Sequence, residues 1–172
     1  RVLGLPYPGG PAVSKLAKEW RDNKEPHLFD LPRPMLHSGD FDFSFSGIKT
    51  AVLYTARDLG HEMTDEEKRA LAGSFENAVV EVLIKKTMNA VKKYGIQTVI
   101  VGGGVAGNTY LRSELTRAVK KVFPEVTLLF PEPWLATDNA VMIGMAAMAQ
   151  AFSGILSDQP LETIRANGNL SL

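Results

Sequence analysis

The residues best placed to do chemistry in this chain surround a run of glycines. Residues 98–101 (Thr-Val-Ile-Val) predict a short buried strand, and the residues that follow, 102–108, read Gly-Gly-Gly-Val-Ala-Gly-Asn. A strand that passes through glycines into a helix leaves backbone N–H groups at the positive end of a helix dipole, open to a flat or anionic ligand. This pattern indicates either a nucleotide-binding turn or a tight connection with no ligand.

The glycine run is distinct from two better-known phosphate-binding motifs. Its spacing formally satisfies G-x-G-x-x-G, but the chain lacks the surrounding βαβ unit and the acidic residue about 20 positions further on. No Gly-Lys-Ser/Thr follows, so the run is not a P-loop. The glycines alone therefore leave the type of ligand open.

A second candidate is Asp138, in the sequence Thr-Asp-Asn that follows a predicted strand at 126–130. The carboxyl ends of neighbouring parallel strands lie on one side of a sheet, so Asp138 and Asn108 are expected to face one crevice. The Asp138 carboxylate can ligate a hard cation, act as a base, or cap the helix that follows. The residues alone favour the cap, a role for which Thr137, Asp138 and Asn139 are all suited.

The elements that would position these residues alternate between helix and strand. Thr64 and Glu67 form a capping box, which predicts a long helix that ends at Gly95. Its apolar residues are spaced to bury one face. Residues 41–47 alternate aromatic with small residues and fit either an edge strand or a packed loop. The other predicted helices cover residues 12–20, 48–59, 109–122 and 140–152, the last rich in small residues suited to close packing.

This order of elements indicates an α/β fold with a parallel sheet. Two strong strands are too few for an independent sheet, so we expect an incomplete sheet and a chain that is a fragment of a longer protein. The first residue is not Met, which agrees with that expectation.

Composition excludes several classes of protein. The 172 residues contain no cysteine, which excludes disulfides and thiolate metal sites and fits a cytosolic protein. No apolar run is long enough to span a membrane. Basic and acidic side chains number 19 each, so no overall field attracts nucleic acid. The local basic clusters are interpreted as solvated helix faces; they are Lys85, Lys86, Lys92 and Lys93, and Arg112, Arg117, Lys120 and Lys121.

Four blocks of sequence occur in an order that is highly specific. They are residues 3–11 (LGLPYPGGP), 41–50 (FDFSFSGIKT), 103–108 (GGVAGN) and 137–143 (TDNAVMI). Together they closely resemble the C-terminal half of the TsaD-like family of transferases for tRNA threonylcarbamoyladenosine synthesis, formerly called glycoproteases or O-sialoglycoprotein endopeptidases. No zincin helix or nucleophile supports the peptidase label.

The resemblance implies the C-terminal lobe of an actin-like, Hsp70-like ATPase fold, with RNase-H-like topology. Residues 1–155 would form part of this lobe, with a helical insertion at about 6–95, and residues 156–172 a loosely ordered tail. The implied activity is transfer of a threonylcarbamoyl group from threonylcarbamoyl-adenylate to the adenosine beside the tRNA anticodon. The alternatives are a non-catalytic scaffold paralogue and a small-molecule kinase of the same fold.

The resemblance also assigns roles to individual residues. Gly10, Gly103, Gly104 and Asn108 would bind the adenylate, an ATP-derived substrate. Asp138 would ligate one divalent metal, usually described as iron, together with an upstream His-x-x-x-His that this chain lacks. No residue is assigned as a catalytic acid or base. The implied partners are tRNA and other proteins of the pathway, including a paralogous dimerisation partner, in the cytoplasm and not at a membrane. We expect this fragment alone to be inactive.

Overall fold

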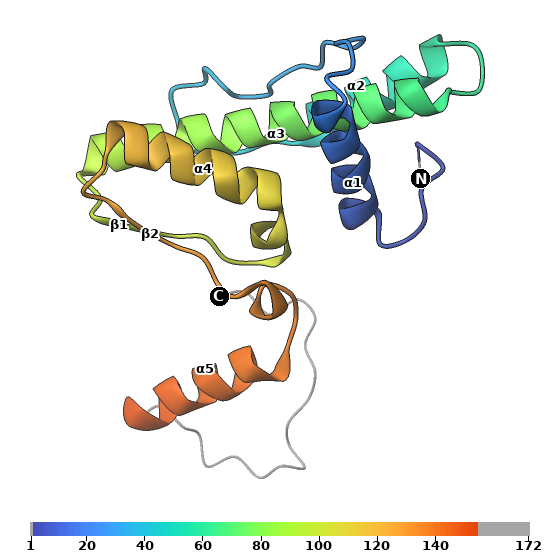
Figure 1. Cartoon of the computed structure of the whole chain (residues 1–172). Helices are drawn as coiled ribbons and strands as arrows, with labels where there is room; N and C mark the ends of the chain where they lie inside the picture. The colour runs from blue at the N-terminus through green and yellow to red at the C-terminus, as the bar shows by residue number, and fades with distance from the viewer. Residues whose placement is uncertain (1, 155–172) are drawn as a thin grey trace.

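A computed structural model describes residues 2–154 as a mostly helical structure with a small sheet (Figure 1). The predicted tail at 156–172 lies outside the described residues. The α-helices are α1 (Gly9–Asp22), α2 (Ser46–Asp58), α3 (Asp65–Tyr94), α4 (Thr109–Val122) and α5 (Ala140–Phe152). The remaining elements are β1 (Thr98–Ile100), β2 (Thr127–Leu129) and the 3-10 turns η1 (Gly104–Gly107) and η2 (Pro133–Leu135).

The 30-residue helix α3 is the central element, and its two ends are those that the sequence predicts. At the start, the Thr64 hydroxyl accepts a hydrogen bond from the Glu67 N–H at 3.2 Å, and the Glu67 carboxylate accepts one from the Thr64 N–H at 2.8 Å. At the end, Gly95 adopts the left-handed conformation with φ of 60°. Both signals are local in the sequence, which explains why the prediction succeeded.

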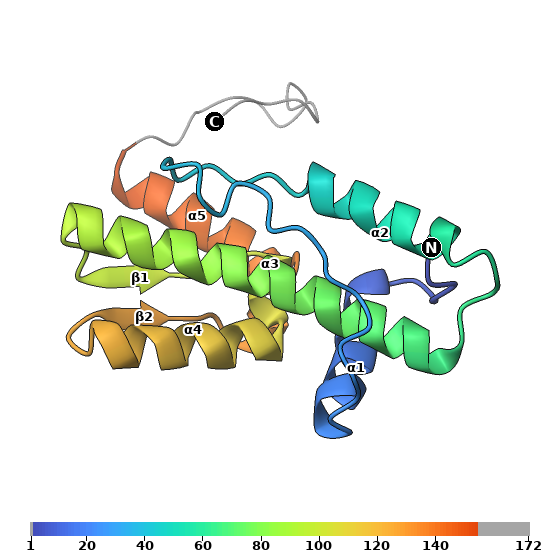
Figure 2. The same cartoon turned by 90° about the horizontal axis from the view of Figure 1, so that it is seen from above.

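The expectation of a single buried face on α3 was too narrow. Five successive residues, 70–74, are all buried, and successive residues point to different sides of a helix. Figures 1 and 2 show why: α1 crosses α3 at a steep angle, α2 lies beside its first half, and α4 runs along its second half. The middle of α3 is therefore enclosed by several elements that are distant in sequence.

The crossing of α1 and α3 depends on a close contact between Trp20 and Gly73. A Cβ atom added to Gly73 would lie 2.3 Å from Trp20 Cε3. The indole is held in place, because its Nε1–H donates to the Pro26 carbonyl at 3.1 Å and its ring contacts His27 edge-on. The absence of a side chain at Gly73 lets the two helices approach each other.

We expect Gly73→Ala to lower the free energy of unfolding of the full-length protein by about 1–3 kcal/mol, since overpacking forces the indole or a helix to move. Thermal or urea unfolding measures the change. Trp20→Leu provides the control, because the smaller side chain should remove most of the cost of Gly73→Ala in the double variant. Equal costs of Gly73→Ala in both backgrounds would contradict the contact described here.

Two other boundaries differ from the sequence prediction. Helix α1 begins at Gly9, three residues before the expected start, because Pro11 falls in the first turn, where no intrahelical N–H bond is needed. Residues 42–45 form no strand and lead directly into α2. Of the two alternatives for the aromatic segment, a loop is the one observed, but Phe43 and Phe45 in it are exposed and not packed in the core.

The irregular segment between α1 and α2 is anchored to α3 by a buried lysine. Lys86 is 2% exposed, and its Nζ donates to the Asp40 carboxylate at 2.7 Å and to the Ser38 hydroxyl at 2.8 Å. The hydrogen bonds from Lys86 and then Ser38 hold the pKa of Asp40 below its ordinary value. The interpretation of Lys86 as part of a solvated helix face was therefore wrong, because a loop 46 residues away covers it.

The two strands are parallel, with Val99 opposite Leu128, and they have one covered and one bare face. On the covered side, these two side chains pack against residues of α3 and α4 that include Val91 and Leu115. On the other side, Ile100 is 75% exposed. The described residues thus form a two-stranded parallel sheet, and the expectation that it is part of a larger sheet stays a prediction.

Helix α5 lies apart from the other helices in Figure 1, and none of its residues is buried. The close packing expected for its small residues is therefore not found within residues 2–154. In this part of the chain no helix has the length and apolar character needed to cross a bilayer.

Candidate functional site

The glycine turn, residues 102–108, leads from β1 to α4. Gly103 has φ of +82°, a conformation that strongly favours glycine. Added Cβ atoms at Gly102, Gly103 and Gly104 would meet nothing within 4 Å, so the backbone here is open to a ligand. This openness is what the sequence predicts for a binding turn.

The path of the turn into the helix differs from the prediction. The 3-10 turn η1 intervenes, in which the Ala106 N–H donates to the Gly103 carbonyl at 2.9 Å and the Asn108 N–H to the Val105 carbonyl at 3.0 Å. The start of α4 is capped, because Asn108 Oδ1 accepts from the Leu111 N–H at 2.8 Å. The N–H groups at the start of α4 are therefore not all bare, and the accessible backbone is that of the glycines.

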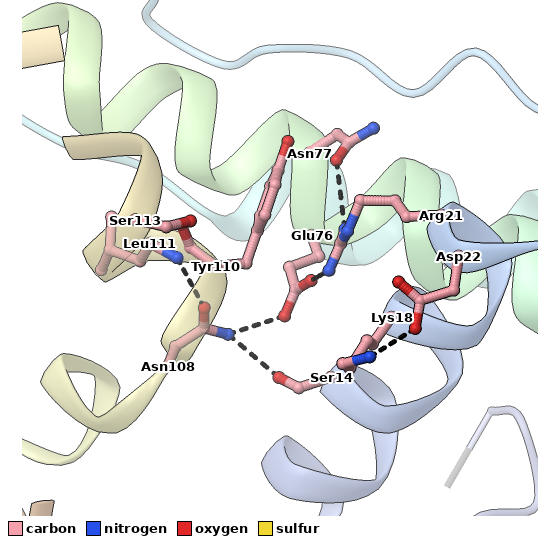
Figure 3. A network of polar contacts seen from close by, with 10 residues as sticks. All are labelled: Ser14, Lys18, Arg21, Asp22, Glu76, Asn77, Asn108, Tyr110, Leu111 and Ser113. Atoms are coloured by element: carbon pink, nitrogen blue, oxygen red, sulfur yellow. Dashed lines mark hydrogen bonds and ion pairs between the residues drawn. The ribbon is translucent and has the colours of Figure 1, made fainter. Parts of the chain in front are cut away.

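The side chain of Asn108 joins three elements (Figure 3). Its Nδ2 donates to the Ser14 hydroxyl on α1 at 3.0 Å and to the Glu76 carboxylate on α3 at 2.7 Å. Ser14 follows Gly10 by four residues, so both lie on the same face of α1. The structure therefore brings the start of α1, with Gly10, towards the glycine turn.

Gly10 is exposed, and an added Cβ at this position would meet nothing within 4 Å. It lies in the first turn of α1, a helix with no side chain capping its start. The N-terminal turn of α1 and the glycine turn thus both offer accessible backbone beside the Ser14–Asn108 hydrogen bond.

The Glu76 carboxylate, 5% exposed, also pairs with Arg21, so a buried acidic group on α3 meets a basic group on α1. The Arg21 guanidinium lies 3.7 Å from the centre of the Tyr110 ring and thereby contacts α4 as well. Burial raises the pKa of Tyr110. Sequence reasoning missed Ser14, Arg21 and Glu76. The sequence did offer one signal for Glu76: it is an acidic residue four positions from both Ala72 and Val80, on the apolar side of α3.

A second bridge ties the glycine turn to the segment after β2. Arg112 on α4 donates through Nε to the Ala106 carbonyl and through its terminal nitrogen to the Pro131 carbonyl. Its guanidinium also lies over the Phe130 ring at 4.9 Å. The interpretation of Arg112 as a solvated basic residue was therefore wrong, because the loops that follow both strands close around it.

Asp138 lies in the loop that follows η2 and is exposed. The cap of α5 is its neighbour: Asn139 Oδ1 accepts from the Met142 N–H at 3.0 Å. Within residues 2–154, no hydrogen bond or ion pair engages the Asp138 carboxylate. The expectation that Asp138 itself caps the helix was thus wrong, and its carboxylate is free for another role.

The loops that carry Asn108 and Asp138 both follow the carboxyl ends of parallel, adjacent strands. They approach one another, since an added Cβ on Gly107 would lie 4.0 Å from the Ala136 Cβ. A shared crevice for Asn108 and Asp138 remains a prediction. Among the described residues, no group of three or more His, Cys, Asp or Glu side chains could hold a metal ion.

A parallel strand, an open glycine turn and a capped helix are typical of α/β proteins that bind nucleotides. Comparison with known families then identifies the group. Residues 1–145 match the family model described as TsaD, tRNA N6-adenosine threonylcarbamoyltransferase, and the chain belongs to this family.

Individual relatives with the same description support the assignment. The chain is 49% identical over 154 residues to a protein from Acidovorax sp. (strain JS42), an alignment that covers 90% of this chain and 42% of that protein. It is 44% identical over 164 residues to one from Thermosipho africanus, covering 95% of this chain and 47% of the relative. It is 46% identical over 154 residues to one from Nitrosospira multiformis, covering 90% and 43%. The chain therefore spans less than half the length of these curated relatives.

Proposed function

We propose that the full-length protein containing this chain transfers a threonylcarbamoyl group from threonylcarbamoyl-adenylate to the adenosine beside the tRNA anticodon. The observation that carries the proposal is the Ser14–Asn108 hydrogen bond, which holds the glycine turn beside the start of α1. Family membership points to the reaction, and the accessible backbone beside this hydrogen bond supports binding of the adenylate there. The family match favours the transferase over the kinase and the scaffold paralogue.

In this proposal, residues 1–155 contribute to the C-terminal lobe of an actin-like ATPase fold. Residues at about 6–95 form a helical insertion, and β1 and β2 belong to a larger sheet completed by other parts of the protein. The bare face of the strands and the unburied helix α5 support this arrangement, because both leave apolar side chains such as Ile100 and Ile143 exposed. The cytoplasm is the proposed location.

The proposed binding residues act mainly by position. Gly10, Gly103 and Gly104 have no side chains, so the adenylate can approach the backbone and accept hydrogen bonds from its N–H groups. Asn108 fixes the end of the glycine turn through three hydrogen bonds. A site that is ordered before the ligand arrives avoids reorganisation during the reaction.

The proposed transfer forms one bond and breaks another. The exocyclic amine of adenosine attacks the carbonyl carbon of the threonylcarbamoyl group, the bond from that carbon to the phosphate oxygen breaks, and AMP leaves. The amine loses one proton, for which no residue of this chain is assigned as base. Holding the two reactants together and stabilising the charge that develops on the carbonyl oxygen are the main contributions expected of the protein.

Asp138 fits the role of one metal ligand. Its carboxylate is exposed and unpaired within the part of the chain that the structure describes, and carboxylate oxygens suit hard or borderline divalent cations. The other ligands would come from outside the described residues. A bound divalent metal would supply Lewis-acid polarisation of a phosphate or carbonyl oxygen.

The experiment that tests the proposal uses the purified full-length protein, unmodified tRNA and threonylcarbamoyl-adenylate. Nucleoside analysis by mass spectrometry is expected to show threonylcarbamoyladenosine, with one AMP released per group transferred. Pathway proteins, among them a paralogous dimerisation partner, are added in a second reaction, because the proposed enzyme acts with them. Unmodified adenosine in both reactions would refute the proposal.

A further inference from the structure

The amide of Asn108 has almost no hydrogen-bonding capacity left for a ligand. A side-chain amide has two N–H donors and two lone pairs on oxygen. Both donors of Asn108 are used, one by Ser14 and one by Glu76, and one lone pair is used by the Leu111 N–H. A single acceptor lone pair on Oδ1 remains, so the side chain can receive a hydrogen bond but cannot donate one.

The orientation of this amide follows from the chemistry of Glu76. An ionised carboxylate only accepts hydrogen bonds, so it requires the Nδ2 end of Asn108 to face it. The opposite end then points Oδ1 at the Leu111 N–H and caps α4. Glu76 and the Leu111 N–H therefore favour the same one of the two possible orientations of the amide, Glu76 from the Nδ2 end and Leu111 from the Oδ1 end.

Glu76 is itself fixed from two sides. Arg21 on α1 pairs with its carboxylate, and the same guanidinium stacks on Tyr110 of α4 and reaches Asn77 (Figure 3). Glu76 is only 5% exposed, so its carboxylate is not open to direct contact with a ligand. Its direct contact with the glycine turn is the hydrogen bond from Asn108.

We propose that Glu76 is a positioning residue for the adenylate. It holds Asn108 with both N–H groups turned inward, so that Asn108 offers an acceptor to a hydrogen-bond donor on the nucleoside part of the ligand. That donor is either the 6-amino group of adenine or a ribose hydroxyl. The inference deepens the proposed function, on which it rests for the identity of the ligand.

A purely structural ion pair would behave differently. Like the Arg21–Glu76 pair, the Lys86–Asp40 pair has one buried member, here the lysine, and it joins α3 to another segment. It contacts neither Asn108 nor the glycine turn. Loss of that pair should lower the melting temperature and leave ligand affinity unchanged. Lys86→Met is therefore the matched control for changes at Glu76.

The test measures binding of AMP to the full-length protein, together with its melting temperature. Glu76→Gln keeps a carbonyl acceptor for the Asn108 amide and should bind AMP within threefold of the wild type. Glu76→Leu keeps the volume and removes the acceptor, and should weaken binding at least tenfold. Equal affinity of the wild type and Glu76→Leu would overturn the inference, as would an equal loss in Lys86→Met.

Ligand analogues test the same claim without depending on how well Glu76→Leu folds. Purine riboside monophosphate lacks the 6-amino group, and 2′,3′-dideoxy-AMP lacks the ribose hydroxyls. One of the two should bind the wild-type protein at least tenfold more weakly than AMP, which also identifies the donor. If the wild-type protein binds both analogues as tightly as it binds AMP, Asn108 does not act as an acceptor for the ligand. If Glu76→Leu folds, this variant should bind the weaker of the two analogues with nearly the same affinity as the wild-type protein does.

The outcomes separate this inference from the proposed function. Loss of AMP affinity in Glu76→Leu, rescued in Glu76→Gln, supports the inference even when the wild type transfers nothing to tRNA. Transfer activity that survives in Glu76→Leu with unchanged AMP affinity refutes the inference and leaves the proposed function standing. If the wild-type protein does not bind AMP, the inference is overturned. The proposed function is then tested independently by the transfer assay.

Discussion

Asp138→Ala in the full-length protein is expected to reduce the rate of threonylcarbamoyl transfer by about a hundredfold or more, comparable to the loss of one charge-stabilising group at a reacting centre. The reason is that the Asp138 carboxylate is exposed and engages no partner within residues 2–154, so its proposed role is to ligate a metal. The same property predicts a small change in the free energy of unfolding, within about 0.5 kcal/mol. Transfer rate, bound metal and melting temperature are measured on one preparation.

Asn139→Ala is the matched control for Asp138→Ala. Asn139 caps α5, so its loss should cost about 1 kcal/mol of stability while metal content and transfer rate stay close to those of the wild type. Asp138→Ala should therefore lower metal content and rate, whereas Asn139→Ala should lower stability. Normal metal content and rate in Asp138→Ala would show that the assignment of Asp138 to the metal is wrong.

The second expected result concerns the chain of 172 residues alone, which should show no detectable transfer to tRNA. Asp138 is a single proposed ligand, and one carboxylate is too few protein ligands for a tight metal site. Helix α5 has no buried residue, and the exposed face of the sheet carries Ile100 and Leu129 without cover. Both observations indicate that the site needs the rest of the full-length protein.

The assay compares equal amounts of the chain and of the full-length protein, with adenylate and unmodified tRNA in excess. A third sample adds the separately produced remainder of the polypeptide to the chain, and recovery of activity in this sample would show that the chain is folded and only incomplete. Turnover by the chain alone at a rate comparable to that of the full-length protein would contradict the prediction.

Local signals in the sequence predicted most of the secondary structure. The capping box at Thr64, the left-handed glycine at Gly95 and the start of α4 at Asn108 all depend on hydrogen bonds within a few residues. The start of α1 was missed because Gly-Gly-Pro is also a turn signal, and only the observed helix shows that the proline occupies its first turn. Boundaries of this kind depend on backbone context that the residue types do not specify.

The polar interior could not be predicted in the same way. Lys86 resembles any other lysine of a basic helix face until the loop with Asp40 covers it. Glu76 meets Asn108 across 32 residues and Arg21 across 55, so its role depends on how three helices pack. The glycine turn was predicted as an open site, but the network that positions Asn108 became visible only in the folded chain.

Mapping where the adenylate binds tests most directly whether the start of α1 and the glycine turn form its site. Photocrosslinking of the full-length protein with 8-azido-AMP, followed by peptide mapping, identifies the labelled segments. We expect label in the peptides that contain residues 9–14 and 102–112, and we expect AMP to compete it away. Specific labelling confined to peptides outside these two segments would contradict it.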